Sequence, residues 1–282
     1  MKSILLPTDF STNSLNAIKY ATVMFKDVSC QFYLLNVQKA SSFISDDMMV
    51  MSASTTIYET LISAAKISID NIIHKIETKH KNDKHQFHSI VDYDNLVDSI
   101  NQNSKIHDID LIVMGTKGAS GLKKALFGSN AVHVMQRCQI PILVVPDNCK
   151  FMGLDKVAFS SNHLELNTAT DLKLLMDLFL HFNFDLDILH IIDETNAYYQ
   201  VFNNESFFKA NFNNVEHQYV TMKSESDFES VQNYIDDAKL KMLVLLNKKH
   251  SFLQRLFVHH LVETIAFKVA VPFLVIPKTE TY

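Results

Sequence analysis

The glycines are the residues whose spacing in this sequence most directly suggests chemistry. The chain has 282 residues and only five glycines, well below the usual frequency of about 7%. Four of the five fall within one short segment, as Gly115, Gly118, Gly121 and Gly128. Glycine is needed where φ is positive or where the backbone must approach another group closely. The cluster therefore predicts a backbone that approaches a ligand, and it argues against a merely flexible surface loop.

The order of residues around this segment favours a polyphosphate as the ligand. The pattern Gly115-x2-Gly118-x9-Gly128-Ser129 follows the apolar run 111–114 and precedes a helix pattern that begins at Ser129. Two common phosphate motifs, GxxxxGK[ST] and GxGxxG, do not fit, because the positions they require hold Lys, Ser or Leu. Backbone amides at a glycine turn and at a helix N-terminus supply hydrogen-bond donors and a partial positive charge. Ser129 is predicted to cap this helix and to offer its hydroxyl to a phosphate oxygen.

Strands and helices that alternate along the first half must position this loop. Apolar runs predict strands near 2–6, 32–37, 86–91, 110–114 and 142–145, and apolar periodicity predicts helices after Ser11 or Thr12, within 55–80, near 95–103 and over 129–138. Such alternation is typical of a doubly wound parallel sheet. In these sheets ligands bind outside the carboxyl ends of the strands. Asp9, Val37 and the Gly115 loop all lie at such ends, so we expect them to meet in one crevice.

The first half resembles a known family. The PTDFS run after the first strand, LNV in the second, and LIVMGTKGASGLKKALFGSNA followed by IPILVVP are similar to a universal stress protein domain of the adenine-nucleotide-binding subgroup, over residues 1 to about 147. The resemblance implies ATP as the ligand, with Mg²⁺ held mostly by the phosphates and water. It also implies roles for ten residues: Asp9 at the ribose or adenine, the Val37 backbone at the adenine, Pro7 and Thr8 in the crevice wall, Met114 and Gly115 at the ribose-phosphate turn, and Gly118, Gly128, Ser129 and Asn130 at the phosphates.

The second half repeats the pattern of the first. The segments 156–162, 186–192 and 241–257 and the run VPFLVIP parallel the strands of the first half and its loop, and 166–180 parallels its first helix. We predict an α/β fold of two tandem doubly wound parallel five-stranded sheets, Rossmann-like and of the adenine nucleotide alpha hydrolase type, packed as a pseudo-dimer. The predicted domains are 1–147, a linker 148–155, and a degenerate copy 156–282. Antiparallel contact of the fifth strands, 142–145 with 273–276, would cover two sheet edges.

The chemistry of the second copy has changed. Asn162 stands where the first copy has Asp9, and Asn247 and His250 are aligned with Gly115 and Gly118. Either His260 and Leu261 or His259 and His260 take the places of Gly128 and Ser129. Because no loop glycine is left, we expect one nucleotide per chain and a structural or partner-binding role for the second copy. A basic cluster there is either an anion site or a solvated loop, and the segment 197–214 matches no motif; the cluster is Lys248, Lys249, His250, Arg255, His259 and His260.

Composition limits the classes of protein and of partner. A net charge of −5, with 47% hydrophobic and 20% charged residues, is typical of a globular protein and does not suggest binding to nucleic acid or to a membrane surface. No apolar run approaches the roughly 18 to 20 residues of a spanning helix, and the first residues do not form a secretion signal. Three cysteines without CxxC spacing favour the cytoplasm. A homodimer is possible, and no protein partner is indicated.

The motif residues favour a binding protein over a dedicated enzyme. Asp9 is the one acid among them, and the resemblance puts it at the nucleoside end of the ligand. Lys117, Lys123 and Lys124 can neutralise phosphates but cannot activate water. We therefore assign no catalytic residue and no protein metal site, and we expect an ATP-binding stress-response regulator. The alternatives are a weak ATP hydrolase or phosphotransferase and an interaction protein that binds no nucleotide.

Overall fold

In the first half the strands and helices follow one another in the predicted order. A computed structural model describes residues 2–38, 51–117, 128–160, 172–193, 205–212, 215–222, 229–247 and 271–277. The strands are β1 Lys2–Pro7, β2 Cys30–Gln38, β3 His85–Tyr93, β4 Leu111–Gly115, β5 Ile142–Val145, β6 Lys156–Ser160, β7 Asp185–Asp193, β8 Val215–Met222, β9 Met242–Asn247 and β10 Phe273–Pro277. The helices are α1 Thr12–Met24, α2 Met51–Lys79, α3 Leu96–Ile106, α4 Ser129–Arg137, α5 Lys173–Phe182, α6 Glu205–Asn211 and α7 Glu229–Asp237.

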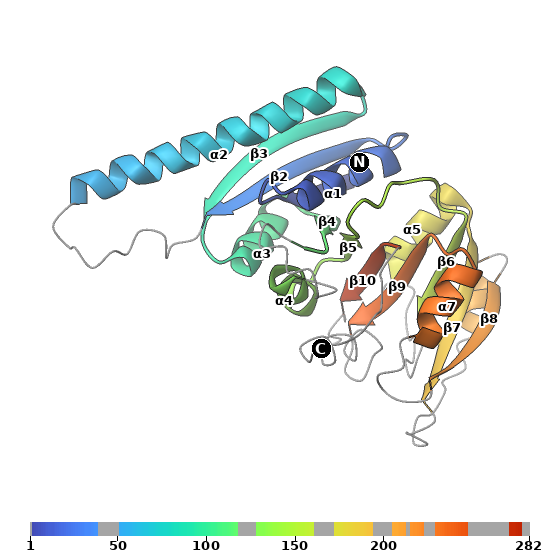
Figure 1. Ribbon diagram of the computed structural model, residues 1–282. Coiled ribbons are helices and arrows are strands. Elements are labelled where there is room, and N and C mark those ends of the chain that lie inside the picture. The colour runs from blue at the N-terminus through green and yellow to red at the C-terminus, as the bar shows by residue number, and fades with distance from the viewer. Residues whose placement is uncertain are drawn as a thin grey trace.

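The ten strands form one continuous sheet in the order β3-β2-β1-β4-β5-β10-β9-β6-β7-β8 (Figure 1). Pairing is parallel within each half, and the same strand order occurs in both halves, read outward from the centre. The halves meet where β5 pairs antiparallel with β10, and Leu143 lies opposite Leu274. The predicted fold class and the predicted pairing of the fifth strands are therefore confirmed, and the two five-stranded sheets join into one.

The helices cover both faces of this sheet. Side chains alternate between the faces of a strand, so Ile4 and Leu6 of β1 belong to one buried cluster and Leu5 to the other. The first cluster includes residues of α1, α2, α5 and α6, and the second includes residues of α3, α4 and α7. This double layer buries most of β1, β2, β4 and β5, whereas β3 stays partly exposed, and the carboxyl ends of β1 to β4 lie at one edge of the sheet.

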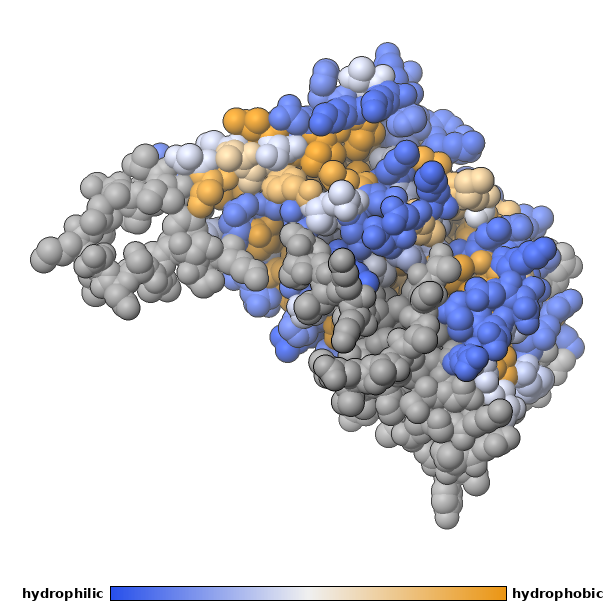
Figure 2. Space-filling view, in the orientation of Figure 1, coloured by the Kyte–Doolittle hydropathy of each residue, from blue (hydrophilic) through white to orange (hydrophobic). Residues whose placement is uncertain are grey.

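Helix α2 is longer than β3, the strand against which it packs. Its 29 residues correspond to a length of about 44 Å, and the helix lies along β3 (Figure 1). Ile69 of α2 is fully buried, whereas Ile67 is 60% exposed. Apolar side chains show on the surface in this region, while hydrophilic side chains cover much of the remaining coloured surface (Figure 2). Within the described ranges, no helix has both the length and the hydropathy that crossing a membrane requires.

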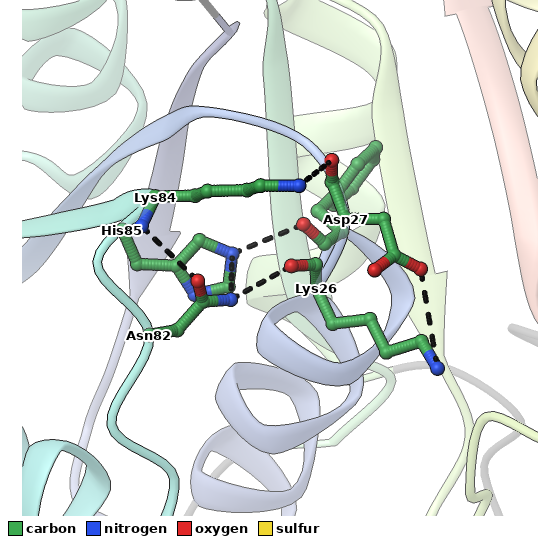
Figure 3. A network of polar contacts seen from close by, with 6 residues as sticks. Lys26, Asp27, Asn82, Lys84 and His85 are labelled. Atoms are coloured by element: carbon green, nitrogen blue, oxygen red, sulfur yellow. Dashed lines mark hydrogen bonds and ion pairs between the residues drawn. The ribbon is translucent and has the colours of Figure 1, made fainter.

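A network of polar contacts fixes the amino end of β3 to the turn between α1 and β2 (Figure 3). Asn82 Nδ2 donates to the carbonyl oxygen of Lys26 at 2.7 Å, and Lys84 Nζ donates to that of Asp27 at 3.0 Å. His85 Nε2 lies 3.0 Å from the carbonyl oxygen of Phe25. These contacts therefore lie at the end of the sheet opposite to the carboxyl ends of β1 to β4.

Side-chain contacts also join the two halves. Asn247 Nδ2 at the end of β9 donates to the carbonyl oxygen of Met135 in α4 at 2.8 Å. Lys2 of β1 forms an ion pair of 2.6 Å with Asp177 of α5. The halves are thus linked at both faces of the sheet in addition to the β5–β10 pairing.

Candidate functional site: a crevice at the ends of the first four strands

A cavity of about 570 Å³ lies at the carboxyl ends of β1 to β4. The strand order reverses at β1, which lies between β2 and β4, and this is the position where doubly wound sheets bind ligands. Seven of the ten predicted site residues line the cavity: Pro7, Thr8, Asp9, Val37, Met114, Gly115 and Asn130. The structure therefore brings the ends of β1, β2 and β4 together as expected. Gly118 lies outside the described residues.

The turn after β1 presents the Asp9 carboxylate at the rim of the cavity. Asp9 is exposed, and its Oδ1 accepts a hydrogen bond of 3.1 Å from the backbone N–H of Ser11. Thr8 Oγ1 accepts from the N–H of Phe10 at 3.1 Å and lies 3.0 Å from Ser14 Oγ. Phe10 has a φ of 63°, which turns the chain sharply before Ser11 caps α1 as predicted. These local bonds hold the carboxylate in a defined orientation.

Neighbouring backbone bonds position the end of β2. The N–H of Thr8 donates to the carbonyl oxygen of Leu35 at 2.8 Å. The buried Asn36 side chain donates from Nδ2 to the carbonyl oxygen of Thr8 at 2.7 Å. Because Asn36 fastens the two strand ends together, Val37 is held against the same cavity as Asp9.

The connection from β4 to α4 begins and ends at two residues that are hydrogen-bonded to each other, Thr116 and Gly128, and we call Thr116, Lys117 and Gly128 the neck of this connection. The N–H of Thr116 donates to the carbonyl oxygen of Val145 at 3.1 Å, and the carbonyl oxygen of Thr116 accepts from the N–H of Gly128 at 2.7 Å. A Cβ at Gly115 would lie 2.8 Å from Cγ and Oδ1 of Asn13. Close packing against α1 therefore explains the glycine at 115.

Helix α4 begins next to the cavity. Its N-cap is Gly128, with φ −68° and ψ 155°, and this cap residue makes no side-chain hydrogen bond. The prediction that Ser129 caps α4 is wrong, because Ser129 is already the first helical residue and Gly128 has the extended cap conformation. Gly128 and Ser129 lie directly before Asn130 but are not among the residues that line the cavity. N–H groups of the first turn that lack a side-chain cap can bind an anion.

The turn between β3 and α3 is the part of the site that sequence reasoning missed. Tyr93, Asp94, Asn95, Leu96 and Val97 all line the cavity. Asn95 caps α3 through Oδ1, which accepts from the N–H of Val97 at 2.9 Å. The available signal was positional, because β3 is parallel to β2 and its carboxyl end must reach the same edge. Other lining residues outside the predicted set are Ser14, Thr116, Lys117, Ala131 and His133.

The charges at the cavity are mixed. Lys117 follows β4, and the carboxylates of Asp9 and Asp94 follow β1 and β3. In the described part of the chain, no cluster of three or more His, Cys, Asp or Glu side chains could hold a metal ion.

The corresponding position in the second half is occupied by leucine. The N–H of Ile112 donates to the carbonyl oxygen of Pro141, and that of Leu243 donates to the carbonyl oxygen of Pro272. This register aligns Gly115 with Leu246, so the alignment of Gly115 with Asn247 is wrong by one residue. The error arose because the second loop has no glycine from which to count. Leu246 is 3% exposed within a buried cluster, and the counterparts at Asn162, His250 and 259–261 lie outside the described residues.

Comparisons with known proteins agree with this architecture. The model of the universal stress protein family matches residues 1–146. A universal stress protein of Methanocaldococcus jannaschii is 28% identical over 144 residues, which cover 51% of this chain and 81% of the relative. The crystal structure of a universal stress protein from Archaeoglobus fulgidus is 16% identical, with a TM-score of 0.63 and coverage of 98% of both chains. A protein of unknown function from Pseudomonas aeruginosa is 10% identical, with a TM-score of 0.57 and coverage of 98% of this chain and 92% of its own.

The two solved structures are similar to this chain in fold across both halves, and the sequence comparisons identify the family through the first half. The family match covers the strands that form the cavity and the segment that joins β4 to α4. On these grounds the chain belongs to the universal stress protein family.

Proposed function

We propose that the first half of this chain binds an adenine nucleotide, preferentially ATP, and that the protein acts as a stress-response regulator. The cavity at the ends of β1 to β4 carries this proposal, because it unites seven residues that the nucleotide-binding subgroup pattern predicts. Its volume of about 570 Å³ lies within the range of roughly 300 to 1,000 Å³ that is typical of small-molecule sites.

The proposed pose follows from the chemistry of each end of the cavity. The Asp9 carboxylate would accept hydrogen bonds from the nucleoside, and the backbone near Val37 would contact the adenine. The α4 N-terminus, the glycine segment and Lys117 would hold the phosphates, because N–H groups and a cation complement their negative charge. Mg²⁺ would accompany the phosphates, with Gly118, Gly128, Ser129 and Asn130 on the phosphate side.

Binding without a dedicated chemical step is the function we favour. A hydrolase needs a base that orients water at the terminal phosphate, whereas the proposed pose puts Asp9 at the nucleoside. We further propose a cytoplasmic protein that does not bind nucleic acid, with domains at 1–147 and 156–282 and a structural or partner-binding second half. The three free cysteines support a reducing compartment.

Replacement of Asp9 by Asn tests the proposed function. We expect Asp9→Asn to weaken ATP binding by about 1 to 3 kcal/mol, because a charge-assisted hydrogen bond becomes a neutral one. Isothermal titration calorimetry with ATP and with GTP measures the affinities, and ATP should bind more tightly. Asp27→Asn is the matched control, because it removes the same charge from the exposed turn at the opposite edge of the sheet.

The same variants distinguish binding from catalysis. Any slow ATP turnover should fall with occupancy in Asp9→Asn and recover at saturating ATP. If Asp9→Asn binds ATP normally but no longer hydrolyses it, Asp9 is catalytic and the protein is a hydrolase. If the native chain binds no adenine nucleotide, the proposed function is wrong.

A further inference from the structure

Asn13 is a buried amide close to the cavity but outside its lining. It is the second residue of α1, it is 5% exposed, and the side chain contacts the segment that leaves β4. Its Nδ2 donates to the carbonyl oxygen of Lys117 at 3.1 Å and to Thr116 Oγ1 at 3.3 Å. A carbonyl oxygen can only accept a hydrogen bond, so this contact fixes the orientation of the amide.

The contacts of Asn13 are made at the neck of the β4–α4 connection. Thr116 is already bonded through its N–H to Val145 and through its carbonyl oxygen to the N–H of Gly128. Asn13 adds a third anchor, from a different helix, at the residue where the chain departs from β4. Thr116 and Lys117 line the cavity and Gly128 begins α4, so the neck sets how both ends of the connection face the cavity.

Two features indicate that the amide of Asn13 is unfavourable for the stability of the fold. In the part of the chain that the structure describes, its Oδ1 is buried without a hydrogen-bond partner, and a buried polar atom without a partner is unfavourable. The same side chain also restricts position 115 to glycine, because a Cβ there would lie 2.8 Å from Asn13 Cγ and Oδ1. A small apolar residue at 13 would avoid both. What the amide provides, and a small apolar side chain would not, is the pair of hydrogen bonds that Nδ2 donates to Thr116 and Lys117.

We propose that Asn13 is a positioning residue for the phosphate end of the nucleotide site. It acts through Thr116 and Lys117, without touching the ligand, and holds the neck in the conformation that receives phosphates. This inference rests on the proposed nucleotide binding, and it adds a determinant of phosphate affinity that is separate from the contacts to the nucleoside.

The prediction is selective, because adenosine lacks the phosphates that the neck would position. We expect Asn13→Ala to weaken ATP binding roughly tenfold, as the loss of about one to two hydrogen bonds would do. Adenosine binding should stay within about twofold of the native value. Asn13→Leu has nearly the same size but lacks the donor and adds no charge, so it should reproduce the loss for ATP if Asn13→Ala folds poorly.

Asn16→Ala is the matched control. Asn16 lies one turn further along α1, and its Nδ2 donates to the carbonyl oxygens of Pro146 and Cys149 at 3.3 and 3.0 Å. It therefore makes the same kind of bond to the chain after β5 and none to the neck. Calorimetry should give native affinities for both ligands in Asn16→Ala. Equal losses for ATP and adenosine in the Asn13 variants, or no loss for either, would overturn the proposal.

Hydrogen exchange of the Gly128 amide separates this inference from the proposed function. In the nucleotide-free protein, Asn13→Ala should speed this exchange roughly tenfold, because the bond from Gly128 to Thr116 closes the neck. Asn16→Ala should leave the exchange unchanged. If the native protein fails to bind ATP but Asn13→Ala speeds the Gly128 exchange as expected, the proposed nucleotide binding is wrong, whereas the role of Asn13 in holding the neck is supported. If the native protein binds ATP and Asn13→Ala leaves the Gly128 exchange unchanged, Asn13 does not hold the neck and the proposal is wrong.

Discussion

At the scale of single residues, burial determines the chemistry of the cysteines. Cys30 is fully buried and Cys138 is 3% exposed, and neither forms a disulfide. Burial is the main cause that raises the pKa of each thiol to about 12. Burial also raises the pKa of Cys149, which is partly exposed in the segment between β5 and β6. The two buried thiols are therefore packing residues, held in their neutral form at physiological pH.

These shifts predict a loss of stability at high pH. A thiol in the unfolded chain ionises near pH 8.5, while the two buried thiols stay protonated until about pH 12. Above the unfolded pKa the unfolded state binds fewer protons, so the free energy of unfolding should fall as the pH rises through this window. Urea unfolding between pH 8 and about 11 measures the slope.

The double variant Cys30→Ala/Cys138→Ala is the comparison for this slope. It should be less stable than the native protein at neutral pH, because it leaves two cavities, but its stability should depend less on pH. Burial raises the pKa values of Tyr20 and Tyr234 as well, and these groups are common to both proteins. Identical slopes in the two proteins would contradict the assignment to the thiols.

At the scale of elements, the β5–β10 pairing explains how two sheets with exposed edges become one. An unpaired central edge would be open to other chains, and this pairing covers it with Leu143 opposite Leu274, each 1% exposed. The outer edges are β3 and β8. This β5–β10 pairing, which we call the seam, therefore belongs to the core of the whole molecule, although it joins strands that are far apart in the sequence.

Truncation at the seam should be costly. We expect Leu274→Ala to lower the thermal midpoint by roughly 5 to 15 °C, since loss of a buried leucine side chain costs about 2 to 5 kcal/mol. Leu180→Ala is the control, because Leu180 on α5 is 79% exposed and exposed substitutions usually change stability by less than about 0.5 kcal/mol. Differential scanning calorimetry of both variants measures the midpoints, and equal midpoints would show that the seam carries little stability.

At the scale of the whole molecule, the two halves share a strand order but not the features of the site. In the first half Gly115 lets Asn13 pack against the end of β4. In the second half the matching position holds the buried Leu246. The buried side chain of Leu246 fills space at the end of β9, whereas Gly115 has no side chain at the end of β4. The same fold therefore presents a different surface at this position in each half.

This difference predicts one nucleotide per chain. Calorimetry with ATP should give a stoichiometry near one, because the proposed site uses glycines that only the first half contains. Leu246→Gly should not create a second site, since it restores one glycine without the rest of the loop; instead it should destabilise the core. Two equivalent sites in the native chain would contradict the assignment of the second half to a structural or partner-binding role.

The sequence by itself determined the order of strands and helices in the first half and the pairing of the two halves, but in the second half it did not predict α6, β8 or α7. Strand β5 has the predicted bounds, 142–145, because its apolar run lies between Pro141 and Pro146 and strand signals are local. Four glycines in a chain that has five located the loop, since few other constraints gather glycines in this way. The family resemblance assigned roles to ten residues, and the structure brings seven of them to one cavity.

Only the tertiary structure decided which other residues meet that cavity and which hold it in shape. The β3–α3 turn and the Asn13 contact join segments that are distant in the sequence, and they depend on strand register and helix packing, which no local pattern contains. Gly128, rather than Ser129, caps α4, because the chain enters the helix from the Thr116 neck. Leu246, rather than Asn247, matches Gly115, because backbone pairing sets the register where the sequence has lost its glycines.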